Sequence, residues 1–341
     1  MKVCSFKGFD SFIIEDRPVP EIKDGEILVK TSIVGICGTD VHKAVHQTVP
    51  VGTVLGHEIS GTVEKVGQGV SKFKVGDRVA IAHHAPCMSC KACLKGNHSL
   101  CEQYLKTNVD PGGFSEYIRL PPENVKHTVK LMPATMKFEE GAFMEPLACC
   151  LRGFHRLEFA PGDDYLIIGM GPIGLLFCMI AKAFNAGTVT GVDLNQFRLD
   201  FARNKAGADF IHNPKDSSWE EFANTHDLPG FSHVIVNVGL GVVYQDAFKH
   251  VGKGTNVLFF AQSPQGQQLT LDPNVVYNNE LSVLGSYSSS PRYLTMALDM
   301  IASGDISVKD LITNVYAPEQ IQDAINLVHA AQDSLKVMIK F

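Results

Sequence analysis

The sequence has no continuous apolar run near the roughly 18 residues that a membrane-spanning helix requires. It also lacks a dense cluster of lysine and arginine, and its formal net charge of −6 argues against a nucleic-acid-binding surface. No internal repeat and no low-complexity tract occurs along the chain. These absences exclude a repeat protein and predict a protein with neither a membrane nor a nucleic-acid partner.

The first residues, 1–7, enter a strand-like segment without the long apolar region of an export signal. Nine cysteines in such a chain indicate a reducing compartment, where thiols serve as metal ligands or core residues. We therefore expect a cytoplasmic protein. The length of 341 residues predicts two domains of about 150 residues each, and 45% hydrophobic and 19% charged residues are typical of soluble globular proteins.

The character of the chain changes near Gly141. Before it, short alternating or β-branched segments are separated by glycine and proline at intervals of roughly ten residues, which predicts a small β-rich domain. After it, apolar runs such as 165–168 and 232–238 alternate with helical patterns. This alternation predicts an α/β fold with a doubly wound parallel sheet.

Four cysteines lie in a short polar and basic segment with the spacing C-x2-C-x2-C-x7-C. This spacing can place four thiolates around one ion, and four sulfur ligands with no open position are typical of a structural Zn²⁺ site. Unpaired core cysteines or disulfides are the alternative interpretation. The segment predicts a metal-binding lobe over about 84–102, with the ligands Cys87, Cys90, Cys93 and Cys101.

A glycine-rich G-x-G-x-x-G stretch follows one predicted strand and opens a predicted helix. Its glycines provide a tight turn, room for a pyrophosphate and close helix–strand packing, and the helix N-terminus favours the anion. Asp193 ends the next predicted strand, where its carboxylate can bind ribose hydroxyls and repel a 2′-phosphate, which favours NAD over NADP. Arg198 could stack on the adenine, contact a 2′-phosphate or lie on a solvated helix face. The predicted cofactor-binding residues are Gly169, Gly171, Pro172, Ile173, Gly174, Asp193, Arg198 and Val238.

Three other stretches carry residues that could bind a second metal. Cys37 lies in Gly-Ile-Cys-Gly-Thr-Asp, His57 and Glu58 lie in Gly-His-Glu, and Glu145 lies in Met-Glu-Pro-Leu-Ala. Their spacing alone does not bring them together. Taken singly, each also fits an ordinary role as a core thiol, a turn histidine or a carboxylate at a helix start.

Together, these stretches resemble the zinc-dependent medium-chain dehydrogenases, and among them the polyol branch related to sorbitol dehydrogenase. The resemblance extends over essentially the whole chain. It implies a GroES-like β-rich catalytic domain formed by 1–150 and 288–341 and a Rossmann NAD-binding domain formed by 151–287.

The resemblance also implies a catalytic zinc that is separate from the structural one, so that two zinc ions and NAD are expected as cofactors. Cys37 and His57 would ligate the catalytic zinc, and Glu58 would be adjacent or directly bound. Glu145 stands where ethanol-type enzymes carry a third ligand cysteine, and glutamate there marks the polyol-like branch.

The implied reaction is the NAD-dependent oxidation of a secondary alcohol on a polyol, sugar or sugar acid, or its reverse. A zinc with an open position lowers the pKa of a bound hydroxyl. Thr39 is then expected to take the alcohol proton, and His42 to connect this relay to water. The alternatives are a threonine or amino-alcohol dehydrogenase, an NAD-binding sensor without catalysis, and an interaction scaffold.

Three further expectations concern the surface. The family implies nucleotide-binding domains that pair edge to edge, and so a homodimer or homotetramer. His83 and His84, just before the cysteine lobe, are expected to form a surface pair, with one of them facing the active-site cleft as the alternative. The hydroxyl-rich stretch 285–293 would suit a polyol and Arg292 a phosphate or carboxylate, with a polar turn as the alternative.

Overall fold

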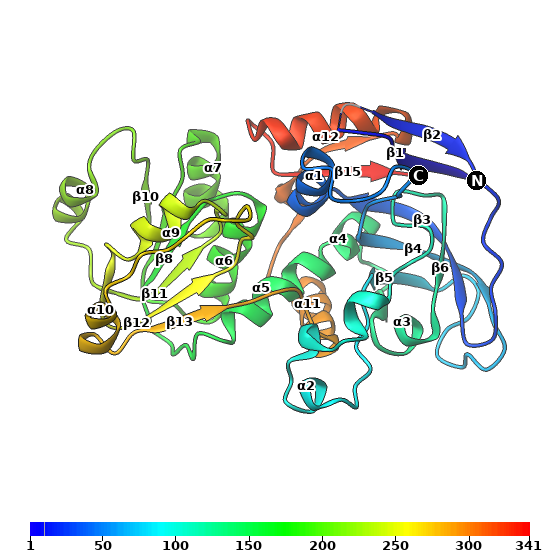
Figure 1. Ribbon diagram of the computed structural model, residues 1–341, viewed down its shortest axis with the longest axis horizontal. Helices are drawn as coiled ribbons and strands as arrows, with labels where there is room; N and C mark the ends of the chain where they lie inside the picture. The colour runs from blue at the N-terminus through cyan, green and yellow to red at the C-terminus, as the bar shows by residue number, and fades with distance from the viewer. Residues whose placement is uncertain (10) are drawn as a thin grey trace. The chain divides into compact units, whose positions relative to one another are not determined.

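The computed structural model describes residues 1–9 and 11–341. The chain divides into two compact units, one formed by 1–148 with 289–341 and the other by 149–288 (Figure 1). Within the described residues, no helix combines the length and the apolar character needed to cross a bilayer. Each unit contains its own sheet and core.

The first unit is built on a seven-stranded sheet with the order β14-β15-β3-β4-β5-β7, in which β6 also pairs with β3. A separate two-stranded sheet pairs β1 with β2 in antiparallel register. The strands are β1 (Lys2–Phe6), β2 (Phe12–Asp16), β3 (Ile27–Gly35), β4 (Glu58–Val66), β5 (Arg78–Ala82), β6 (Tyr117–Leu120), β7 (Val129–Leu131), β14 (Ile312–Tyr316) and β15 (Lys336–Lys340).

Short helices connect these strands. They are α1 (Gly38–Val45), α2 (Lys91–Leu94), α3 (Pro122–His127), α4 (Phe138–Ala142), α11 (Pro291–Ser303) and α12 (Ile321–Ala330), with the 3-10 turns η1 (His98–Leu100), η2 (Tyr104–Lys106), η4 (Lys309–Leu311) and η5 (Pro318–Gln320). Helix α5 (Met144–Phe154) runs across the boundary between the two units.

The C-terminal end of the chain completes the first unit. Strand β15 pairs antiparallel with β3, and Met338 lies opposite Gly35. Helix α12, red in Figure 1, lies beside α1 and β2, which are blue. The backbone N–H of Ile36 donates to the Val337 carbonyl at 2.9 Å, so the last strand passes directly beside the segment that leads into α1.

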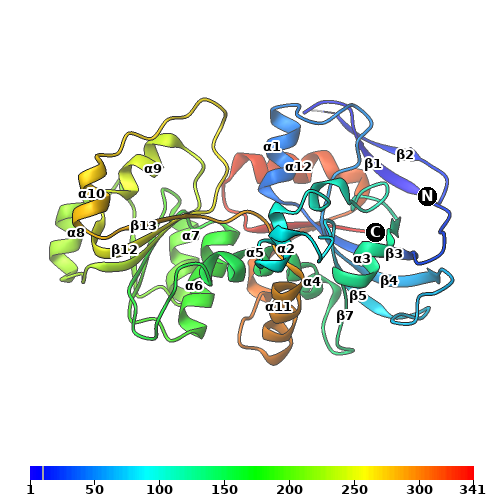
Figure 2. The ribbon, with the colours of Figure 1, turned by 60° about the horizontal axis from the view of Figure 1, so that its bottom comes forward.

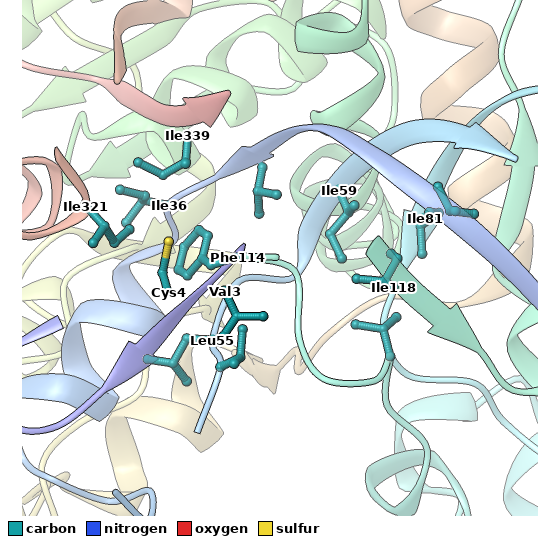
Figure 3. Close-up of a cluster of buried hydrophobic side chains, with 14 of the residues drawn as sticks. Val3, Cys4, Ile36, Leu55, Ile59, Ile81, Phe114, Ile118, Ile321 and Ile339 are labelled. Atoms are coloured by element: carbon teal, nitrogen blue, oxygen red, sulfur yellow. The ribbon is translucent and has the colours of Figure 1, made fainter. Parts of the chain in front are cut away.

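A continuous apolar cluster forms the core of this unit. Figure 3 shows Val3, Ile59, Phe114, Ile321 and Ile339 meeting from strands, loops and α12 that are far apart in the sequence. All five side chains are at most 1% exposed. Burial of apolar surface contributes about 25 cal/mol per Å² to the free energy of folding. This shared core therefore holds the N- and C-terminal segments of the unit together.

The second unit contains a six-stranded sheet with the order β10-β9-β8-β11-β12-β13, and every pair in it is parallel. The strands are β8 (Tyr165–Ile168), β9 (Val189–Val192), β10 (Phe210–His212), β11 (Phe231–Val236), β12 (Val251–Phe259) and β13 (Ser282–Gly285). The predicted doubly wound parallel sheet, and with it the predicted α/β fold class, is confirmed.

Helices cover both faces of this sheet, and Figure 2 shows α6 on one side of the strands and α9 on the other. They are α6 (Pro172–Ala183), α7 (Gln196–Phe201), α8 (Trp219–His226), α9 (Gly241–Ala247) and α10 (Pro273–Asn278), with one π-helical turn η3 (Ala202–Ala206). Strands buried on both faces read as continuous apolar runs, which explains the sequence Tyr-Leu-Ile-Ile of β8.

Candidate functional site

Three residues that the sequence separates lie together in the first unit. One ligand atom from each of Cys37, His57 and Glu58 falls within 4.8 Å of the other two. His57 and Glu58 are buried, whereas Cys37 is half-buried. A thiolate, an imidazole and a carboxylate are all zinc ligands, and three protein ligands leave one position open for a substrate.

The pairing of β3 with β4 places Glu58. Glu58 is the first residue of β4 and lies opposite Gly35, the last residue of β3. A Cβ at Gly35 would overlap Glu58 Oε2. Glycine at position 35 therefore makes room for the carboxylate next to the segment that carries Cys37.

The loop before β4 places His57. Gly56 has a φ of +87°, and a Cβ there would lie 2.8 Å from the ring of the fully buried Phe114. Both the backbone conformation and the close packing require glycine. The core residue Phe114 thus sets the turn from which His57 enters the cluster.

Asp40 orients His57 and the loop around it. Its Oδ1 lies 3.3 Å from His57 Nδ1 and accepts a hydrogen bond from the Gly56 N–H, while its Oδ2 accepts one from the Cys37 N–H. A carboxylate at Nδ1 leaves Nε2 for a metal, as in many zinc sites. Burial alone would lower the pKa of His57, but the charges of Asp40 and Cys37 raise it well above its usual value.

Lys336 of β15 forms a buried ion pair with Glu58. Its Nζ lies 2.7 Å from both carboxylate oxygens, and Lys336 and Glu58 are 4% and 1% exposed. Burial alone would lower the pKa of Lys336, but the charges of Glu58 and Cys37 raise it. This lysine supplies positive charge to a site that holds a carboxylate and a thiol.

The remaining predicted residues of this site have different surroundings. Glu145 is buried and its charge raises the pKa of Lys336, but it is not part of the close cluster, so its role as a ligand remains a prediction. Thr39 is exposed in the first turn of α1. His42 is half-buried in the same helix, with its ring 4.4 Å from that of His46.

His83 and His84 do not form a surface pair, so that expectation was wrong. The ring of His83 lies 4.8 Å from that of His57 and 3.8 Å from that of His84, which in turn packs against Tyr104. Burial lowers the pKa of His83 well below its usual value and that of His84 to about 4. Strand β5 ends just before them and carries both rings toward the cluster.

The four-cysteine lobe provides a second group of side chains that could hold a metal ion. One sulfur atom from each of Cys87, Cys90, Cys93 and Cys101 lies within 4.8 Å of the others, and the Cys87 and Cys93 sulfurs are 4.0 Å apart. The edges of a tetrahedron with Zn–S bonds of about 2.3 Å measure about 3.8 Å. All nine cysteines are free thiols, which rules out the disulfide alternative in this structure.

Hydrogen bonds from nearby backbone N–H groups favour the thiolate form of one of these cysteines. Hydrogen bonds from the Ser89 and Cys90 backbone N–H groups lower the pKa of Cys87 to about 6. Burial, together with side-chain hydrogen bonds to Cys90 and Cys101, raises the pKa of Cys93 to about 12. The donor set therefore fits a zinc ion, which needs thiolates and replaces their missing positive charge.

The glycine-rich loop of the second unit has the form that a dinucleotide needs. Gly169 follows β8 with a φ of +94°, and a Cβ at Gly174 would overlap the Gly169 carbonyl oxygen. A Cβ at Gly171 would meet only Arg198 Nη1, at 3.8 Å, so this glycine leaves the approach to the N-terminus of α6 open.

Asp193 lies beside this loop. Its carboxylate accepts hydrogen bonds from the Met170 N–H at 2.7 Å and the Asn195 N–H at 2.9 Å. An ionised carboxylate has about four acceptor positions, so capacity remains for ribose hydroxyls. The residues around the loop thus fit the dinucleotide predicted for them.

Comparison with known proteins agrees with both halves of this architecture. The family model described as "Alcohol dehydrogenase GroES-like domain" matches residues 23–132, and the one described as "Zinc-binding dehydrogenase" matches residues 172–303. The chain belongs to the zinc-dependent medium-chain alcohol dehydrogenase family. It is therefore a zinc-dependent oxidoreductase that uses a nicotinamide dinucleotide, and the family resemblance is confirmed.

Individual relatives cover the full length of the chain. A sorbitol dehydrogenase from Bacillus subtilis (strain 168) is 33% identical over 347 residues, which cover 99% of this chain and 97% of the relative. The crystal structure of a galactitol-1-phosphate dehydrogenase from Escherichia coli is 27% identical, with a TM-score of 0.89 and complete coverage of both chains. A zinc-binding dehydrogenase from Sinorhizobium meliloti 1021, crystallised with NADP, is 28% identical with a TM-score of 0.90 and coverage of 100% and 99%.

Reasoning from the sequence missed Asp40 and Lys336 as members of the site, and it offered a histidine facing the site at position 83 or 84 only as an alternative. Asp40 could have been noticed, because it follows Cys37 by three residues and acidic side chains often bond back to an N-cap. His83 carried a weaker signal as one of two adjacent histidines. Lys336 lies 278 positions from Glu58, so no local pattern could have linked the two.

The Lys336–Glu58 pair leads to a stability prediction. We expect Lys336→Met to destabilise the metal-free protein by about 3–5 kcal/mol, because it leaves Glu58 buried without a counter-charge. The double variant Lys336→Met/Glu58→Gln should recover most of this loss. Urea denaturation measures both, with Lys340→Met at the exposed end of the same strand as the control. An equal loss in the single and double variants would refute the pairing.

Proposed function

We propose that this protein oxidises a secondary alcohol of a polyol or related sugar with NAD, or catalyses the reverse reduction. The observation that supports this most strongly is the cluster of Cys37, His57 and Glu58, with Asp40 behind the histidine and Lys336 behind the glutamate. In this proposal the first unit performs the chemistry and the second, 149–288, binds the dinucleotide.

Each side chain has a distinct task in this proposal. Cys37 and His57 would hold the catalytic zinc, with Glu58 or Glu145 as a further ligand, and the four-cysteine lobe would hold the structural zinc. When bound, the catalytic zinc supplies a Lewis acid that lowers the pKa of an alcohol hydroxyl. Asp40 holds the His57 ring in one orientation, and Lys336 limits the negative charge around the site.

The proton path begins at Thr39 in the proposal. Thr39 lies two residues after Cys37, and its exposed hydroxyl can accept the alcohol proton and pass it on. His42 lies one turn further along α1, and burial together with the charge of His46 lowers its pKa. A neutral imidazole at position 42 can accept this proton and release it to water.

The substrate class rests on the relatives. One relative is named for the sugar alcohol sorbitol and the other for a sugar-alcohol phosphate, galactitol-1-phosphate. In the stretch 285–293, Ser289 and Ser290 are buried and Arg292 is exposed with its guanidinium 5.9 Å from the Tyr293 ring. We take an unphosphorylated polyol as the substrate class, after the sorbitol dehydrogenase, and a sugar phosphate, which Arg292 would suit, as the alternative.

A substrate screen tests the proposal. We expect polyols such as sorbitol and xylitol to produce NADH, followed by its absorbance, and to do so faster than threonine or sugar phosphates. A chelator that removes zinc should abolish the rate. Turnover of threonine alone would favour the amino-alcohol alternative, and absence of turnover with intact NAD binding would favour a sensor.

Two variants separate the roles of the zinc sites. We expect His57→Ala to abolish turnover and leave one zinc in a folded protein, because the four-cysteine lobe remains intact. We expect Cys90→Ser to lower thermal stability, because it removes a ligand of the structural ion. Zinc content, circular dichroism and initial rates measure these effects, and equal loss of folding in both variants would contradict the division of roles.

NAD preference is the next prediction. We expect Asp193→Ala to reduce the ratio of kcat/KM for NAD over NADP by about 10- to 100-fold, because the carboxylate no longer binds ribose or repels a 2′-phosphate. Asp193→Asn is the matched variant, since it can keep an acceptor for the Met170 N–H but loses the charge. A wild-type preference for NADP would overturn the assignment.

The proton relay predicts a rate effect at Thr39. Thr39→Val keeps the shape of the side chain but removes its hydroxyl, and we expect kcat to fall on the order of 10²–10⁴-fold with much less change in KM. Thr48→Val, an exposed position beyond α1, is the control. If Thr39→Val keeps full activity across pH, the proton must leave through another group.

We also propose a cytoplasmic homodimer or homotetramer. The nine free thiols suit a reducing compartment. Strand β13 lies at the edge of the parallel sheet, where Val283 is 43% exposed, although Leu281 just before it is buried. An exposed apolar edge strand is a ready template for pairing with a second copy.

The edge strand provides a test of assembly. We expect light scattering to give the mass of a dimer or tetramer for the wild-type protein. In Val283→Lys the measured mass should shift toward that of a monomer, because lysine at a sheet edge disfavours strand pairing. Val242→Lys, on the exposed face of α9, should leave the mass unchanged. A wild-type protein that is monomeric at micromolar concentration would refute the proposal.

A further inference from the structure

The first unit contains an open cavity, here called the α4 cavity, that none of the candidate metal ligands lines. Its volume is about 260 Å³, and its walls come from β3, β5, β15 and the beginning of α4. Helix α4 packs against β3, β4 and β5 (Figure 1), and the Ser60 hydroxyl of β4 donates to the Phe138 carbonyl at 2.7 Å. The helix is thus fixed on the sheet, and the cavity beside it has a defined shape.

Three of the side chains that line the α4 cavity are cations. Arg78 begins β5, Lys137 directly precedes α4, and Lys340 ends β15. None of the three forms an ion pair with a carboxylate side chain among residues 1–9 and 11–341. Of the described residues that line the cavity, Glu139 alone carries a carboxylate. Three cations against one carboxylate leave two positive charges, in a chain whose formal net charge is −6.

Arg78 is held in one position in the wall of the cavity. Its two terminal nitrogens donate to the carbonyls of Pro133, Ala134 and Met136. Its guanidinium also lies 4.4 Å from the centre of the Phe138 ring. Carbonyl partners have no net charge, so the positive charge of the arginine remains available to an anion. Because the side chain is already fixed, little conformational entropy is lost when an anion binds.

The α4 cavity also has an apolar part. Ile33 and Lys340 lie opposite each other across the antiparallel pair β3–β15, which places both side chains on the same face of the sheet. The buried Ile33 and the half-buried ring of Phe138 both line the cavity. A short hydrocarbon chain can pack against these two residues while charged groups at its ends meet the cations.

We propose that the α4 cavity binds a small organic acid with two carboxylates. Two net positive charges match two carboxylates, and the apolar side chains match the carbon chain between them. The cavity is smaller than the roughly 300–1,000 Å³ of pockets that take drug-sized ligands, which favours a short dicarboxylate over a nucleotide. This site is separate from the Cys37, His57 and Glu58 cluster and from the glycine-rich loop, so the inference goes beyond the proposed function.

Calorimetric titration of the full-length, zinc-loaded protein with succinate tests the site. We expect succinate to bind and its neutral diamide, succinamide, not to bind, because the diamide keeps the carbon chain but lacks the charges. Inorganic phosphate should bind several-fold more weakly than succinate, because it has no carbon chain to pack on Ile33 and Phe138. Raising NaCl from about 20 to about 200 mM should weaken succinate binding, because salt screens charges in an open cavity.

The two exposed lysines provide the variants. Lys137→Met/Lys340→Met keeps much of the aliphatic length and removes two charges. We expect it to lower succinate affinity about tenfold or more, since each exposed ion pair contributes up to about fivefold. Lys253→Met, at an exposed position of β12 in the second unit, removes the same charge elsewhere and is the matched control. Unchanged affinity in the double variant would overturn the inference, because succinate would then bind at another place, such as the catalytic metal.

Thermal unfolding distinguishes a ligand site from a structural role of the lysines. Without succinate, the double variant should be as stable as wild type or more stable, because repulsion among three neighbouring cations is relieved. Succinate should raise the Tm of the wild type and have little effect on that of the double variant. A clear fall in Tm of the ligand-free double variant, or wild-type protein that does not bind succinate, would overturn the inference. Succinamide or phosphate binding as tightly as succinate would overturn the assignment of a dicarboxylate.

Discussion

The buried ion pair between Glu58 and Lys336 connects the two ends of the first unit and the chemistry of the cluster. Glu58 begins β4 near the N-terminal part of the chain, and Lys336 begins the last strand. Each charge alone would be costly in a nearly dry environment, so each depends on the other. Cys37 lies in the same neighbourhood and its charge also raises the pKa of Lys336, so the lysine offsets negative charge from both residues.

The ion pair and the cluster around it limit which residues and backbone conformations can occur in the adjoining loops. Gly35 must lack a side chain for Glu58 to approach β3, and Gly56 must turn with a positive φ against Phe114 for His57 to point into the cluster. Asp40 then links the two loops through the N–H groups of Cys37 and Gly56. The ligands are thus held by core packing and backbone hydrogen bonds, and a metal would find the site already formed. Such preorganisation reduces the entropy that binding must overcome.

The second unit uses a different physical device for a different ligand. Its parallel strands all end at one edge, where free N–H groups of α6 and the glycine turn favour an anion. Asp193 stands beside this turn and accepts a hydrogen bond from the Met170 N–H.

Local sequence signals determined much of this protein's fold and two of its candidate binding sites. The spacing of the four cysteines, the glycine pattern after an apolar strand and the alternation of strands with helices act over a few residues, so they predicted the metal lobe, the cofactor loop and the α/β fold from the sequence alone. Cys37, His57 and Glu58 were recognisable only by resemblance, because nothing in their spacing requires them to meet. Tertiary structure decided the rest. Lys336 reaches Glu58 only because β15 returns beside β3, and His83 reaches His57 only because of where β5 ends. These contacts arise from strand pairing between distant segments, and the energy that selects that pairing is the burial of a shared core, which no short stretch of sequence contains.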